Sequence, residues 1–111
     1  MTNRNKSHGF GYERRRLREI RNAGGYGFRA FASKGIVDLV YVDAEGIAHL
    51  EQLKFSSKGK ARISKQELEE LKAFASQWDG KPCHVSLVIK NAYKPVEIIR
   101  LNNRVGNDGR T

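Results

Sequence analysis

The sequence has few cysteines, few acidic residues and no long apolar run, and each shortage excludes a class of protein. Cys83 is the single cysteine among 111 residues, which excludes an internal disulfide and a zinc site made of cysteines alone. No stretch approaches the roughly 18 consecutive apolar residues that a membrane helix requires. The basic first residues are followed by no apolar stretch, so no secretory signal is visible. We expect a protein of the cytoplasm without membrane contact.

The charge is strongly unbalanced towards basic residues. Twenty-one Lys and Arg face twelve Asp and Glu, which gives a net charge of +9 and a pI near 10. A basic domain of this size suggests a polyanionic partner. No basic amphipathic helix with bulky apolar residues is visible, which favours nucleic acid over an anionic membrane. The alternative is that the charge serves solubility alone.

Hydrophobic periodicity and turn residues predict one domain of two helices and five strands. We expect a helix over residues 11–23, ended by Gly24 and Gly25, and a second one opened by Ser64 and Glu67 as a capping box. The predicted strands cover residues 27–32, 36–42, 47–55, 84–90 and 95–101. The second helix is long enough for a parallel crossover, so we expect an α/β fold with a mixed five-stranded sheet flanked by helices. Residues 1–9 and 102–111 are expected to be flexible ends of this single domain.

Several acidic and polar residues stand where apolar ones are expected. Asp38 lies inside a predicted strand, and Glu13 shares the apolar stripe of the first predicted helix with Leu17 and Ile20. In the strand over residues 47–55, alternation sends Gln52 and Lys54 to one face. Burying a charged group in such a place costs free energy unless another charged group lies next to it. We therefore expect these side chains to converge.

A carboxylate, a second oxygen ligand and a lysine on one patch of sheet suit hydrolysis of a phosphodiester. Magnesium prefers oxygen ligands and usually keeps several waters, and a bound cation activates water and polarises the phosphoryl group. A lysine can orient or deprotonate that water, or offset charge in the transition state. From the residues alone, a surface ion-pair ladder and simple nucleic-acid binding remain open alternatives.

The sequence resembles the archaeal-type Holliday junction resolvases, a branch of the PD-(D/E)xK nuclease superfamily. The segments that carry the resemblance are GYERRRLREIRNAGGYGFRAFASKGIVDLVYV, HLEQLKFSSKGKARISKQELEELKAFASQW and CHVSLVIK. They contain an acid before a basic residue at Glu13 and Arg14, and an aromatic-Arg strand at Phe28 and Arg29. The hydrophobic-Asp-hydrophobic strand around Asp38 follows. The resemblance implies a restriction-endonuclease-like core and cleavage of four-way DNA junctions.

The resemblance also implies a metal site and roles for its residues. Glu13, Asp38 and Gln52 would surround Mg²⁺, with Mn²⁺ as a possible substitute, and no small-molecule cofactor is implied. Lys54 would act as the catalytic base or electrostatic partner. Ser33 would touch the scissile phosphate or hold a catalytic water.

The sequence departs from the family at the E-x-K motif, which reads here as Gln52-Leu53-Lys54. In one interpretation Gln52 is the ligand through its amide oxygen, because it keeps the i, i+2 relation to Lys54. In the other, a bulge rotates the strand and Glu51 becomes the ligand. A loss of activity is a third interpretation.

By the same resemblance, the partner is branched DNA and the protein is a homodimer that cuts two opposed strands symmetrically. A cellular archaeal origin and a viral origin both fit, so the cytoplasm would be that of a prokaryote or of a host. A non-catalytic junction-binding protein and a nuclease that acts on flaps or mismatched DNA are the alternative functions. The candidate contacts to DNA phosphates are Arg4, Lys6, Arg14, Arg15, Arg29, Lys34, Lys58, Lys60 and Arg62.

Overall fold

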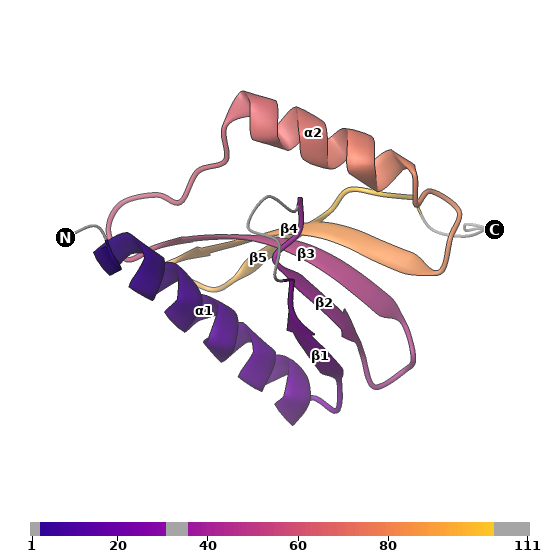
Figure 1. Cartoon of the computed structure of the whole chain (residues 1–111), viewed down its shortest axis with the longest axis horizontal. Helices are drawn as coiled ribbons and strands as arrows, with labels where there is room; N and C mark the ends of the chain where they lie inside the picture. The colour runs from indigo at the N-terminus through magenta and orange to yellow at the C-terminus, as the bar shows by residue number, and fades with distance from the viewer. Residues whose placement is uncertain (1–2, 31–35, 104–111) are drawn as a thin grey trace.

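Two helices enclose a mixed five-stranded sheet in the part of the chain that the computed structural model describes, residues 3–30 and 36–103 (Figure 1). The elements follow in the predicted order, which confirms the α/β class. Their bounds are α1 (Asn3–Asn22), β1 (Tyr26–Arg29), β2 (Leu39–Val42), β3 (Ala48–Ser56), α2 (Lys65–Ser76), β4 (Cys83–Asn91) and β5 (Glu97–Arg100).

The strands lie in the sheet in the order in which they occur in the chain. Strands β1, β2 and β3 pair antiparallel, as do β4 and β5, whereas β3 and β4 pair in parallel. A parallel pair needs a connection that returns to the starting end of the sheet, and α2 provides it. The mixed sheet with a helical crossover is therefore as predicted.

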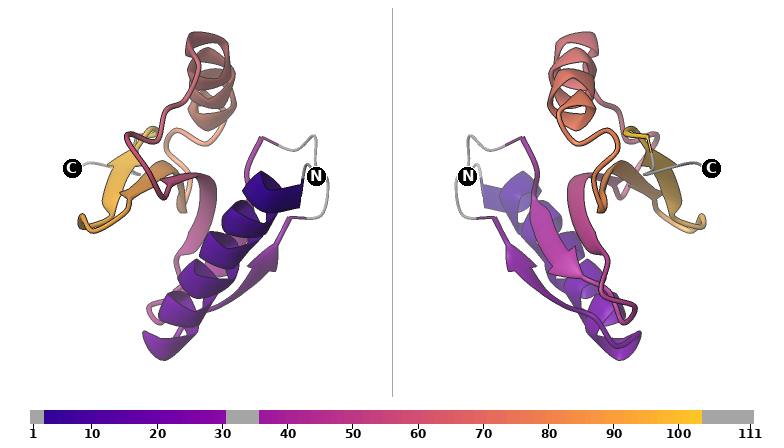
Figure 2. Two further views of the ribbon diagram at one scale, coloured as in Figure 1. Left: turned by 90° about the vertical axis from the view of Figure 1, so that its left-hand side faces the viewer. Right: turned by 90° about the vertical axis from the view of Figure 1, so that its right-hand side faces the viewer.

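Each helix covers one face of the sheet (Figure 2). On the α1 face, Leu17 and Ile20 pack with Leu39, Leu53 and Val88. On the other face, four residues form the buried centre of the α2 cluster: Leu71, Ala75, Val85 and Leu87. Alternation along β3 divides its side chains between the two clusters, because successive residues point to opposite faces.

Several boundaries differ from the predicted ones, and those of α1 and β2 bear on the candidate site. Helix α1 begins at Asn3 rather than at residue 11, so the prediction of a flexible N-terminal end over residues 1–9 is wrong from Asn3 onwards. Extending an existing helix adds one hydrogen bond per residue and needs no new nucleus, which offsets the low helix propensity of Asn, Ser and Gly here. Strand β2 begins at Leu39, so Asp38 lies at a bend before the strand rather than inside it. Nevertheless, the Asp38 amide donates to the Glu51 carbonyl at 2.7 Å, which continues the ladder.

The predicted flexible C-terminal tail begins too early, because Asn102 is 4% exposed. Its Nδ2 donates to the carbonyls of Trp78 at 2.9 Å and Cys83 at 2.7 Å. Its Oδ1 accepts from the Val85 amide at 2.8 Å. Asn102 thus ties the end of the described chain to the start of β4 and to the turn after α2. Residues 104–111 of the predicted tail lie outside the described part.

None of the helices in residues 3–30 and 36–103 is long and apolar enough to cross a membrane.

The N-terminus of α2 is fixed by the predicted capping box. The Ser64 hydroxyl accepts from the Glu67 amide at 3.0 Å, and the Glu67 carboxylate accepts from the Ser64 amide at 3.2 Å. Both bonds satisfy amides that the first helical turn leaves without partners. The box fixes both the start of α2 and the direction of the Glu67 side chain.

Replacing the cap tests this account. We expect Ser64→Ala to lower the free energy of unfolding by about 1 kcal/mol, because the Glu67 amide loses its acceptor. Ser57→Ala, at an exposed position after β3, is the matched control and should change it by less than about 0.5 kcal/mol. Urea denaturation measures both. Equal stability of the two variants would contradict the role of the cap.

Candidate active site

Asp38 is the centre of the candidate site and contacts β3 directly. Its Oδ2 accepts from the Leu53 amide at 2.7 Å and from Gln52 Nε2 at 3.4 Å. Burial raises the pKa of the Asp38 carboxyl; the Leu53 amide and Lys54 act in the opposite direction, and the charge of Glu67 raises the pKa further. The bend before β2 therefore presents a partly desolvated carboxylate at the strand that carries Gln52 and Lys54.

Glu13 approaches the same carboxylate from α1. Its side chain is 18% exposed, and its Oε1 lies 3.4 Å from Arg29 Nη1 on β1. Burial and, next to it, the negative charge of Asp38 raise the pKa of the Glu13 carboxyl, whereas Arg29 lowers it. A partly buried carboxylate whose pKa is raised further by a second carboxylate is suited to a cation, because a cation offsets both negative charges.

Lys54 and Gln52 point to the α2 face of β3, as alternation predicts. Lys54 Nζ lies 3.2 Å and 3.1 Å from the two carboxylate oxygens of Glu67. Lys54 is 22% exposed and Glu67 48%. The ammonium group thus contacts a carboxylate on the helix, and its charge also acts on Asp38.

Glu51 belongs to a different, buried cluster on the α1 face. It is 1% exposed, and its two oxygens accept from Arg16 Nε at 3.0 Å and Arg16 Nη2 at 2.8 Å. The Tyr41 hydroxyl donates to Glu51 Oε2 at 2.6 Å. Burial, with the neighbouring carboxylate, raises the pKa of Tyr41. Both oxygens of Glu51 are therefore engaged, on the face opposite to Lys54.

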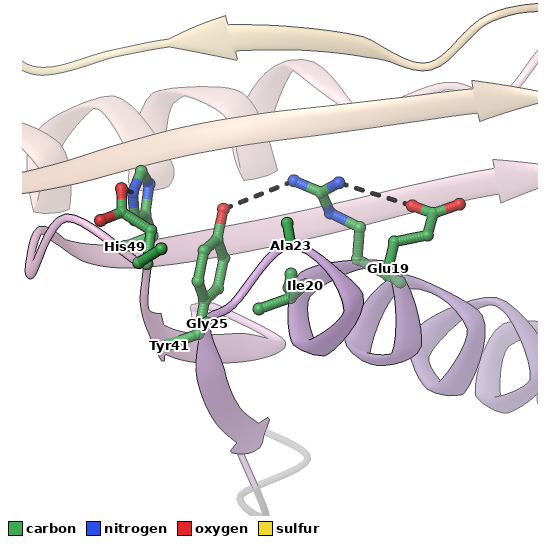
Figure 3. A pocket seen from close by; sticks show the side chains of 9 residues that line it. Glu19, Ile20, Ala23, Gly25, Tyr41 and His49 are labelled. Carbon is green, nitrogen blue, oxygen red and sulfur yellow. Dashed lines mark hydrogen bonds and ion pairs between the residues drawn. The ribbon is translucent and has the colours of Figure 1, made fainter.

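A pocket of about 220 Å³ lies beside this cluster, where α1 ends (Figure 3). The rings of Tyr41 and His49 stack along its wall, with centroids 4.5 Å apart. His49 Nε2 lies 2.8 Å from Asp43 Oδ2 in the turn before β3. None of Glu13, Asp38, Gln52 and Lys54 lines it, so this pocket is separate from the candidate active site.

The candidate DNA contacts are in part exposed and in part outside the described residues. Arg14 is exposed on α1, and Lys58, Lys60 and Arg62 are exposed in the segment between β3 and α2. Arg15 lies over the rings of Tyr12 and Phe55, with centroid distances of 5.6 and 5.7 Å. Ser33 and Lys34 lie outside the described residues, as do the side chains of Arg4 and Lys6.

Two residues of these clusters were not singled out from the sequence. Arg16 was one of several arginines in a basic run, and only the turn of α1 shows that it points inwards to Glu51. Glu67 was predicted as a capping residue, but the crossover that brings α2 over Lys54 gives it a second contact. Within the described residues, no three His, Cys, Asp or Glu side chains are grouped to hold a metal, so a cation here needs the Gln52 amide or water as well.

Comparisons with known proteins agree with this architecture. The family model described as archaeal Holliday junction resolvase (hjc) matches residues 4–107. The structure is similar to that of Archaeoglobus fulgidus Hjc, a Holliday junction resolvase from an archaeal hyperthermophile. The TM-score is 0.57 at 24% sequence identity, and the match covers 80% of this chain and 72% of that one. No curated protein sequence matches the chain.

The raised pKa of Asp38 has a consequence for stability. Because the carboxyl binds its proton more tightly in the folded state than in the unfolded chain, folding becomes less favourable as the pH rises through the raised pKa. We expect Asp38→Asn to melt at a higher temperature than the wild type at pH 7 without divalent cations. The difference should shrink as the pH falls towards about 3, below the ordinary pKa of Asp.

Thermal unfolding between pH 3 and pH 8 measures this difference. The exposed Glu69→Gln is the control for a lost negative charge and should follow the wild type. A lower melting temperature of Asp38→Asn at pH 7 would show that the ionised carboxylate stabilises the fold.

The two carboxylates that contact Arg16 should differ sharply in their contributions to stability. We expect Glu51→Gln to lower the free energy of unfolding by about 3 kcal/mol, since it leaves a largely buried guanidinium without its counter-ion. Glu19, which is 55% exposed and lies 3.6 Å from Arg16 Nη1, is the matched partner. Glu19→Gln should lower it by less than about 1 kcal/mol. Urea denaturation that gives similar losses for both would contradict the buried ion pair.

Proposed function

Since the chain belongs to the archaeal Holliday junction resolvase family and is thus a junction-resolving endonuclease, we propose that it hydrolyses the phosphodiester bond at Glu13, Asp38, Gln52 and Lys54. The observation that carries this assignment is the Asp38 carboxylate, which contacts Gln52 and is influenced by the charge of Lys54. Burying this carboxylate costs free energy that Lys54 offsets only in part, and a carboxylate with an amide and an ammonium group near it suits a cation and a phosphate.

We propose Mg²⁺ as the cation, held by Glu13, Asp38 and Gln52, with Mn²⁺ as a possible substitute. Two carboxylates and an amide supply hard oxygen atoms, and water completes the shell that magnesium prefers. When bound, the cation lowers the pKa of a coordinated water and polarises the phosphoryl group. Gln52 must then turn its amide oxygen, rather than the nitrogen that now faces Asp38, towards the ion.

The geometry supports Gln52 rather than Glu51 as this ligand. Glu51 lies on the α1 face with both oxygens engaged by Arg16 and Tyr41. Bringing it to the cation would leave the Arg16 guanidinium without a counter-ion in a buried place. Gln52 needs only a side-chain rotation.

In this proposal Lys54 contacts the scissile phosphate group of the DNA. Its ammonium lies on the same face of β3 as Gln52 and contacts the Glu67 carboxylate on α2. It can orient the attacking water or offset the charge that develops on the phosphate oxygens. Ser33, in the segment before β2, is proposed to touch the scissile phosphate or a catalytic water.

The DNA is held by phosphate contacts rather than by reading of bases. The net charge of +9 supports this assignment, and such binding weakens steeply with salt. The exposed basic residues between β3 and α2 follow the strand that carries Gln52 and Lys54, so they can hold the backbone near the site. The proposed contacts are those predicted from the sequence: Arg4, Lys6, Arg14, Arg15, Arg29, Lys34, Lys58, Lys60 and Arg62.

Resolution of a junction requires two cuts, and we propose that a homodimer supplies them. The described residues contain one candidate site, centred on Asp38, so a symmetric pair of chains would present two. A two-fold axis shared by protein and junction makes the two cuts equivalent. The cytoplasm remains the proposed location.

Asp38→Ala tests the assignment. We expect no cleavage of a synthetic immobile four-way junction in magnesium, with junction affinity within about threefold of the wild type, because the change removes a ligand and no phosphate contact. Denaturing gels follow cleavage, and gel shifts without divalent cation follow binding. Glu45→Ala, in the exposed turn before β3, is the control and should cleave normally.

Magnesium should also raise the melting temperature of the wild type but not that of Asp38→Ala, because a ligand stabilises only a fold that binds it. Cleavage by Asp38→Ala in magnesium would refute the site. Flap and linear duplex substrates, incubated in parallel, show whether the four-way junction is preferred.

A further inference from the structure

The contact between Glu67 and Lys54 joins α2 to the proposed cleavage site. Both oxygens of Glu67 lie within hydrogen-bond distance of Lys54 Nζ, at 3.2 and 3.1 Å. A lysine side chain has four rotatable bonds, and holding it in one place requires a fixed partner. The two oxygens of Glu67 provide that partner.

Glu67 is itself held by the backbone. Its Oε1 accepts from the Ser64 amide at 3.2 Å as well as from Lys54, and its own amide donates to Ser64 Oγ at 3.0 Å. The Ser64 amide and then the Lys54 ammonium lower the pKa of the Glu67 carboxyl, which keeps it ionised. A carboxylate anchored at a helix N-terminus is a rigid element on which to place a long side chain.

The charge of Glu67 also extends beyond Lys54. It acts on Asp38, where it raises the pKa of the carboxyl while Lys54 lowers it. Strand β3 offers a neutral amide at Gln52, so the negative charge nearest to Lys54 on this face comes from the helix rather than from the strand. Lys54 therefore contacts one carboxylate, that of Glu67 on α2, and its charge acts on a second, that of Asp38 before β2.

We propose that Glu67 is a positioning residue of the cleavage site, which holds the Lys54 ammonium beside Asp38 where the phosphate is cut. The proposal rests on the proposed function and adds a residue to it. Glu67 acts through Lys54, and it makes the placement of Lys54 depend on the packing of α2.

A plain surface ion pair is the competing explanation, since most such pairs contribute at most about 1 kcal/mol to stability and nothing to activity. The surface ion pair and the positioning role predict different cleavage rates for a variant with a neutral residue at position 67. Glu67→Gln keeps the capping box, because Gln serves equally at this position, and removes the charge that holds Lys54. A surface pair predicts normal cleavage by this variant.

The experiment compares single-turnover cleavage of a synthetic four-way junction in magnesium with junction affinity measured by gel shift. We expect Glu67→Gln to cleave at least about tenfold more slowly with affinity within about twofold of the wild type. Glu69→Gln, the same change at an exposed position two residues further along α2, should cleave at the wild-type rate.

Wild-type cleavage by Glu67→Gln would overturn the proposal, as would a loss of affinity without a loss of rate. If Glu67→Gln does not fold, Glu67→Asp replaces it. Asp keeps the charge at the helix N-terminus but draws it back from Lys54, and its full activity would equally overturn the proposal. A wild-type chain that does not cleave junctions would instead refute the proposed function.

Discussion

The buried ion pair between Arg16 and Glu51 is the interaction on which the rest of the structure depends. It lies between α1 and the centre of the sheet, and the Tyr41 hydroxyl completes it from β2. A buried charge pair adds little to stability by comparison with apolar packing, but it tolerates only one arrangement of its partners. We infer that it favours a single register of α1 on the sheet, and with it the position of Glu13, three residues before Arg16.

The same strand supports two chemistries on its two faces. The α1 face of β3 carries Glu51, whose charge is fully compensated. The α2 face carries Gln52 and Lys54, and there the neighbouring carboxylate of Asp38 is desolvated and incompletely compensated. The desolvated carboxylate of Asp38 lowers the stability of the fold on the α2 face of β3. The ion pair of Glu51 holds the strand in place on the α1 face. Such an arrangement is common where a site must stay ready for a cation.

The sequence predicts the order of elements, the parallel crossover and the capping box because each leaves a local pattern. It also predicts that Glu13 and Asp38 belong to a site, since acidic residues among apolar ones can be recognised in the sequence itself. It does not predict that Arg16 rather than Arg14 or Arg15 turns inwards, because all three stand in one basic run. That choice depends on the register of α1.

The contact of Glu67 with Lys54 and the burial of Asn102 were likewise not predictable from the sequence. Each joins segments that are distant in the chain, and a capping residue or a polar residue near the C-terminus has an adequate local explanation. Only the packing of α2 across β3 and β4, and the return of the chain past β5, give these residues their second roles.

The parallel pairing of β3 and β4 has a consequence for the order in which the chain folds. The hairpin of β2 and β3 closes a short loop, whereas the pairing of β4 with β3 closes a longer one that contains α2. Contacts between distant segments form late because their loop-closure entropy must first be overcome. The contact between Lys54 and Glu67 thus belongs to the long-range part of the fold, together with the hydrophobic cluster that α2 forms with β4.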